Sequence, residues 1–140
     1  MVEVKELKRA LIAAGFEVFR TRGEEIHLAE RQNVSLMEAG VRVRAGAAPM
    51  VFVVARAQRS DAVSVRPEQL FDLVRSRSAP LAAEGFSEVS AEPREIRSVS
   101  DAAQLVDTWY EVTFSRAASD IDGLIRLTRA AFALERYVVP

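Results

Sequence analysis

Residues 41–57 read VRVRAGAAPMVFVVARA, and two strand patterns follow one another within them. Residues 41–45 alternate apolar and charged side chains, which is typical of a strand with one buried face. Residues 46–49 carry the glycine and proline of a turn, and residues 50–57 are almost continuously apolar, as in the interior of a sheet. A short turn between two strands implies antiparallel pairing, so this segment predicts the middle of an antiparallel sheet.

The flanking sequence predicts more strands and three helices. Residues 16–22 and 25–31 predict a hairpin, residues 86–98 an edge strand interrupted by Pro93, and residues 105–116 a further strand. Helical spacing of apolar residues appears in residues 3–14, in a segment that starts at Pro67, and in residues 119–136. This order predicts one α+β domain, residues 1–140: a two-layer sandwich whose mainly antiparallel sheet of five to six strands carries helices on one face.

Composition excludes several kinds of site. The chain has no cysteine and one histidine, His27, so thiolate chemistry, disulfides and multi-histidine metal sites are excluded. No catalytic signature accompanies His27, which is expected on the polar face of a strand. We therefore predict a protein that is not an enzyme and holds no cofactor. The first six residues lack the apolar core of a signal peptide and no apolar run approaches about 20 residues, which predicts a cytoplasmic protein without a membrane contact.

Arginine is distributed unevenly along the chain. Residues 1–66 hold eleven Lys/Arg against eight Asp/Glu, a net charge of +3, whereas residues 67–140 hold eight against twelve, a net charge of −4. Residues two apart in a strand point the same way, so Arg20 and Arg22 share a face, as do Arg42 and Arg44. Three more arginines lie near strand ends: Arg31, Arg56 and Arg59. Up to seven guanidinium groups are therefore expected to line one sheet surface.

Two interpretations of this arginine face stay open. Guanidinium groups suit carboxylates and phosphates, which favours an acidic protein segment or a nucleic-acid backbone as the ligand. Alternatively, the face is only solvated, and the arginines pair with neighbouring glutamates. The glutamates available for such pairs are Glu17, Glu24, Glu25, Glu30 and Glu38.

Two apolar features also invite a binding role. Trp109 and Tyr110 must point to opposite faces of one strand, and Tyr110 is expected in the core with Val106, Val112 and Phe114. Trp109 then either anchors a partner on the face without helices or packs in a second, minor core under the helix that starts at Pro67. Residues 32–40 fit neither period, which suggests a partner-docking loop or an irregular, bulged strand.

The order helix, three or four strands, helix, two strands, helix resembles the fold shared by type III secretion chaperones and the YbjN-like proteins. The resemblance runs from the helix that begins near Val4 to the helix that ends near Arg136. It implies a protein that binds other proteins and often dimerises.

The sequence as a whole predicts a non-catalytic protein-binding module, a chaperone or adaptor for another protein. The predicted partner-binding residues are Arg20, Arg22, Arg42, Arg44 and Trp109. The expected partner is another protein with an acidic segment, and a homodimer is a further expectation. The alternative is a nucleic-acid or phosphate-ligand binding protein that uses the same arginines, which the nearly neutral net charge of −1 makes the less favoured reading.

Overall fold

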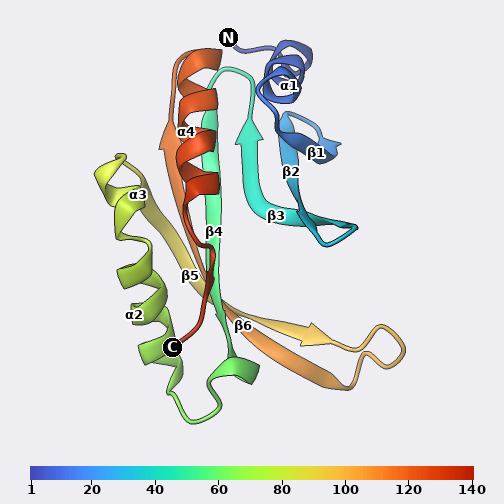
Figure 1. The fold of residues 1–140 in the computed structure, drawn as a ribbon, viewed down its shortest axis with the longest axis vertical. Helices are drawn as coiled ribbons and strands as arrows, with labels where there is room; N and C mark the ends of the chain where they lie inside the picture. The colour runs from blue at the N-terminus through green and yellow to red at the C-terminus, as the bar shows by residue number, and fades with distance from the viewer.

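The computed structural model describes all residues, 1–140, as four α-helices, a short 3-10 helix and seven strands (Figure 1). In chain order they are α1 (Val4–Ala13), β1 (Glu17–Arg22), β2 (Glu25–Gln32), β3 (Ser35–Arg44), β4 (Met50–Gln58), η1 (Arg59–Asp61), α2 (Pro67–Arg77), α3 (Ala79–Ala83), β5 (Ser87–Arg97), β6 (Leu105–Ala117), α4 (Ile121–Ala133) and β7 (Tyr137–Val138).

The strands form one sheet in the order β1-β2-β3-β4-β6-β5, and every neighbouring pair in this path is antiparallel. β7 joins off the path as a short parallel partner of β4. The predicted α+β sandwich with a mainly antiparallel sheet is confirmed, with seven strands rather than five to six. β7 accounts for the extra strand, because two residues carry no periodicity that sequence can reveal.

The helices α1, α2 and α4 pack on one face of this sheet. Leu7 and Leu11 of α1, Leu70 of α2 and Leu124 and Leu127 of α4 are fully buried. They pack against a layer of apolar side chains from alternate positions of the strands. This layer consists of Ile26, Leu28, Val41, Val43, Val51, Val53, Ala55 and Val112. One core therefore lies between the sheet and its helices, and the opposite sheet face has no helix over it (Figure 1).

Both edge strands are entered through the same turn. α1 ends at Gly15 with φ +97°, and the N–H of Phe16 bonds back to the carbonyl of Leu11 at 3.0 Å. α3 is followed in the same way by Gly85 with φ +84°, and the N–H of Phe86 bonds back to the carbonyl of Leu81 at 2.9 Å. This is the Schellman motif, in which glycine supplies the left-handed conformation. The predicted helix stop at Gly15 is confirmed.

β3 bends sharply in the middle. Gly40 has φ +75°, and the β2–β3 register shifts between His27 and Ala29. Above the bend β3 pairs with β4, from Val41 to Arg44, and below it the strand swings away with β2 (Figure 1). The predicted ambiguity at residues 32–40 thus resolves as the irregular, bulged strand, and Val34 lies exposed in its hairpin turn.

Gly40→Ala is expected to lower the free energy of unfolding by about 1–3 kcal/mol. The left-handed backbone disfavours any Cβ, and here the Cβ would also lie 3.1 Å from the carbonyl oxygen of Val54. Gly23→Ala is the matched control, since Gly23 has φ +61° but open space around it. Urea denaturation should show a larger loss of unfolding free energy for Gly40→Ala than for Gly23→Ala. Equal losses in the two variants would mean that the close approach of residue 40 to β4 carries no cost.

The C-terminal segment fills the gap that the bend opens. The carbonyl of Arg136 accepts a hydrogen bond from the N–H of Arg56 at 2.9 Å, just before β7 pairs with β4. The guanidinium of Arg136 reaches across to β3 and donates to the carbonyl of Ala39 at 3.0 Å. It also donates to the carboxylate of Glu30 on β2 at 2.6 Å. Arg136 therefore joins the two halves of the sheet where β3 and β4 part.

The N-cap of α4 is Asp120, whose carboxylate accepts a hydrogen bond from the N–H of Gly123 at 2.7 Å. One local prediction is wrong. Val106 does not join Tyr110 in the core but is 60% exposed, because β6 extends there beyond the helix layer. α2 ends at Arg77 with Ser78 as its C-cap, and the short helix α3 then starts with Pro80 in its first turn.

Candidate binding groove

The sheet face without helices, here called the open face, carries polar and aromatic side chains in register. His27 of β2 lies opposite Arg20 of β1 and Arg42 of β3, and Arg42 lies opposite Phe52 of β4. These positions alternate with the buried ones along each strand, as the pleat requires. The predicted sharing of a face by Arg20 and Arg42 follows directly from this register.

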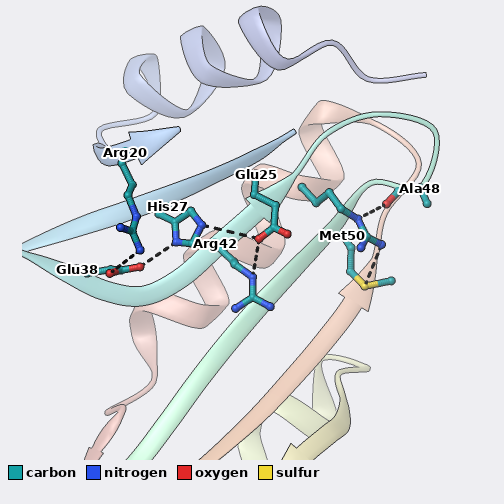
Figure 2. Close-up of polar contacts among 8 residues, drawn as sticks. Arg20, Glu25, His27, Glu38, Arg42, Ala48 and Met50 are labelled. Atoms are coloured by element: carbon teal, nitrogen blue, oxygen red, sulfur yellow. Dashed lines mark hydrogen bonds and ion pairs between the residues drawn. The ribbon is translucent and has the colours of Figure 1, made fainter. Parts of the chain in front are cut away.

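Glutamates bridge the basic side chains of this row. Figure 2 shows Arg20 and His27 meeting at Glu38, with the carboxylate 3.6 Å from Arg20 Nη2 and 2.8 Å from His27 Nδ1. Glu25 stands 3.8 Å from His27 Nε2 and 2.9 Å from Arg42 Nε (Figure 2). His27 lies on the polar face as predicted, although its side chain is only 15% exposed because these neighbours cover it.

Arg44 and Arg22 lie at the end of the open face that leads to the β3–β4 turn. Both are in register with Glu25, which stands between them. Arg44 donates to the carbonyl of Ala48 at 3.2 Å, and its guanidinium carbon lies 5.3 Å from the ring centre of Phe52.

Arg31 and Arg59 were expected on the same surface as the other arginines, but both make their contacts outside the row of the open face. Arg31 pairs with Glu17 at 3.0 Å and lines a separate hollow beside the C-terminal segment. Arg59 donates to the hydroxyl of Tyr110 at 3.4 Å. Four of the predicted glutamate partners do pair with arginines, so part of the arginine charge is neutralised within the sheet: Glu17, Glu25, Glu30 and Glu38.

Trp109 anchors the other end of the open face. Its ring lies under Arg56, whose guanidinium carbon is 3.7 Å from the indole centre and 4.4 Å from the ring of Tyr137. Arg94 approaches the same indole at 5.7 Å. Tyr110 packs in the core against Phe71 of α2. Trp109 therefore lies on the open face and not in a minor core under α2, and its role as a partner anchor stays a prediction.

Asp107 sits two residues before Trp109 at this end. Burial raises the pKa of its carboxyl, but hydrogen bonds from Ser60, Thr108 and Trp109 outweigh that and leave the pKa below its ordinary value. The Ser60 hydroxyl donates at 2.7 Å, which fixes the segment after β4 to β6. Trp109 is thus held by its hydrogen bond to Asp107 and by the stacking of Arg56 on its ring.

Between the two ends lies a groove with a volume of about 470 Å³. Its floor contains Gly40 and Val54, and its walls come from β1, β2, β3, β5 and β6. The lining residues are Arg20, His27, Met37, Glu38, Gly40, Val41, Arg42, Val54, Arg56, Arg94, Trp109, Glu111 and Thr113. Of the five predicted partner-binding residues, Arg20, Arg42 and Trp109 line this groove, whereas Arg22 and Arg44 lie outside it.

The groove is basic and its arginines are incompletely paired. Four arginines and two glutamates line it, which gives a charge of +2 with His27 neutral. Glu111 lies 3.8 Å from Arg56 and 3.9 Å from Arg94, both longer than hydrogen bonds. The Nε atoms of Arg42 and Arg56 are buried without a hydrogen-bond acceptor, since Glu25 approaches Arg42 in a geometry that makes none.

Sequence reasoning missed the role of Gly40 in the groove and the stacking of Tyr137 on Arg56, and it expected Arg56 only as an arginine near a strand end. The run at residues 50–57 looked like a wholly interior strand, although Phe52, Val54 and Arg56 alternate onto the open face. The sequence does contain a signal for the position of Arg56, because Arg56 lies two residues after Val54 and therefore on the same face of the strand.

No group of three or more histidine, aspartate or glutamate side chains is arranged so that it could hold a metal ion. None of the helices reaches the length and apolar character needed to cross a membrane. Comparison with known proteins gives no match to a family model, a curated protein or a solved structure. The likeness to type III secretion chaperones and YbjN-like proteins therefore stays a prediction from the order of elements.

Proposed function

We propose that this chain is a non-catalytic protein-binding module, a chaperone or adaptor, that holds a segment of its partner in the open-face groove. The observation that carries this proposal is the Arg56–Trp109–Tyr137 stack at one end of the groove together with the incompletely paired Arg42 at the other. Aromatic and arginine side chains dominate the energetics of protein interfaces, and stacked arginines lose little side-chain freedom when they bind. The groove also has an apolar floor, which suits side chains of a polypeptide.

Nucleic acid is a weaker candidate for the same groove. Bases bind single-strand proteins by stacking on open aromatic faces, but Arg56 covers Trp109 and Arg42 covers Phe52 at 4.3 Å. A phosphodiester backbone carries a charge at every nucleotide, so it would also place a negative charge beside Glu38. The groove lining contains both arginines and glutamates, and a polypeptide can carry side chains of both charges to match them. We therefore favour a protein partner.

Arg42→Glu is expected to reduce partner capture at least about tenfold, because it reverses a charge inside the groove. The measurement is a pulldown from nuclease-treated lysate with the tagged protein, quantified by mass spectrometry. The unfolding free energy should fall by no more than about 2 kcal/mol, since Arg42 contributes one partly exposed ion pair and one cation–π contact.

Arg44→Glu is the matched control, because Arg44 lies two residues further on the same strand and face but outside the groove. Capture by this variant should stay close to that of the parent protein. Equal losses with both variants would mean that charge on the face as a whole, not the groove, attracts the partner. Capture that disappears on nuclease treatment of the parent protein would favour the nucleic-acid alternative.

A further inference from the structure

The spacing of the groove arginines points to one kind of ligand. We infer that the groove binds an extended acidic segment of the pattern carboxylate-x-apolar-x-carboxylate, with the two carboxylates at Arg42 and Arg56. This inference rests on the proposed protein-binding function and names the chemistry of the bound segment.

The register fixes the distance between the two arginines. Arg42 lies opposite Phe52, and Arg56 is four residues further along β4. Four residues of strand span about 13 Å. An extended polypeptide has the same rise, so side chains four positions apart in the ligand match the two arginines without strain.

The floor between the arginines fits a side chain midway. Val41 pairs with Val53, which places Gly40 beside Val54, and a Cβ at Gly40 would lie 3.7 Å from the Cβ of Val54. Gly40 and Val54 both line the groove between the arginines, and the Val54 side chain is only partly buried there, so it is open to the ligand's middle residue. In an extended segment the first, third and fifth side chains share a face, so an apolar third residue faces Val54.

Both arginines have unused donors. A guanidinium carries five N–H groups, and Arg56 has only a carboxylate at 3.8 Å, with its Nε buried and unpaired. The guanidinium carbon of Arg42 lies 4.3 Å from the ring centre of Phe52, and its one ion pair is with Glu25. Stacking holds each guanidinium plane in place, so an arriving carboxylate meets a positioned fork and can bind both terminal nitrogens.

The test uses two peptides of identical composition. The first, acetyl-Ala-Glu-Ala-Leu-Ala-Glu-Ala-amide, has glutamates four positions apart with leucine midway. The second places the two glutamates side by side. Trp109 is the single tryptophan of the chain and lies in the groove, so its fluorescence reports occupancy, with calorimetry as an independent measurement. The first peptide should bind at least about tenfold more tightly than the second.

Variants connect the binding to the two arginines. Arg42→Gln and Arg56→Gln should each weaken the first peptide at least about tenfold, with the fold checked by circular dichroism. Arg9→Gln, on the exposed side of α1, should leave it unchanged. Arg56→Glu should instead bind a peptide whose second glutamate is replaced by lysine.

Equal binding of the two peptides, or tighter binding of an oligothymidylate, would overturn the inference. If lysate capture still depended on Arg42 in that case, the protein-binding proposal would stand without this ligand pattern. If capture were also insensitive to Arg42, both proposals would fall.

Discussion

Arg136→Ala is expected to lower the free energy of unfolding by about 2–4 kcal/mol, because it removes the buried partner of a half-buried ion pair and several hydrogen bonds to carbonyls. The Arg136 side chain is 10% exposed and lies 2.6 Å from the carboxylate of Glu30. It also donates to the carbonyls of Ala39, Ala131 and Leu134 at 3.0, 3.0 and 3.2 Å. Burial lowers the pKa of Arg136, and the charge of Glu30 opposes that shift. Alanine would leave Glu30 and three carbonyls without this donor.

The control for this variant is Arg126→Ala on α4. Arg126 is 59% exposed and pairs with Glu84 at 3.4 Å, so its loss should cost less than about 1 kcal/mol. Urea denaturation followed by far-ultraviolet circular dichroism measures both variants. The double variant Arg136→Met with Glu30→Gln should cost less than the sum of the two single variants, since no carboxylate is then left unpaired. Similar losses for Arg136→Ala and Arg126→Ala would show that the buried pair does not hold the sheet together.

Tyr110→Ala is expected to cost about 3–5 kcal/mol, whereas Trp109→Ala, one residue away, should cost only about 1 kcal/mol. Tyr110 is 5% exposed and meets Phe71 of α2 edge to face at 5.4 Å. Its removal leaves a cavity between β6 and α2. Trp109 instead covers part of the open face, where its loss removes cation–π contacts with Arg56 and Arg94.

Partner capture should depend more on Trp109 than on Tyr110, which is the reverse of the order expected for stability. Trp109→Ala should abolish capture of the partner, and Tyr110→Phe should leave capture and most of the stability intact, because it removes only a hydroxyl. Circular dichroism is the measurement for unfolding, since fluorescence is lost with Trp109. A larger stability loss at Trp109 than at Tyr110 would reverse the assignment of the two faces.

Most elements of the fold could be predicted because they carry a period. The alternation at residues 41–45, the apolar run at 50–57 and the helical spacing in residues 3–14 all correspond to observed elements. Edge placement of β5 followed from Pro93, which cannot donate a ladder hydrogen bond. β7 escaped prediction because its two residues are held by β4 and Arg136, which are contacts distant in sequence.

The groove could be predicted only in part. Strand alternation placed Arg20, Arg42 and Trp109 on one face, but it also included Arg22 and Arg44, because a face has no boundaries in sequence. Where the groove lies depends on the bend at Gly40, and where Arg56 points depends on Trp109 and Tyr137. These are tertiary effects of residues up to 97 positions apart, as between Ala39 and Arg136.

The position of β4 in the sheet has a consequence for synthesis. β4 is the most apolar strand, and on one side it pairs with β3, which the ribosome has already made. Its other edge waits for β6, where Trp109 to Ala117 are its partners. At about 5–20 residues per second, that edge stays open for on the order of seconds. Stalled or truncated chains are therefore expected to aggregate through this edge of β4, which β6 covers in the finished fold.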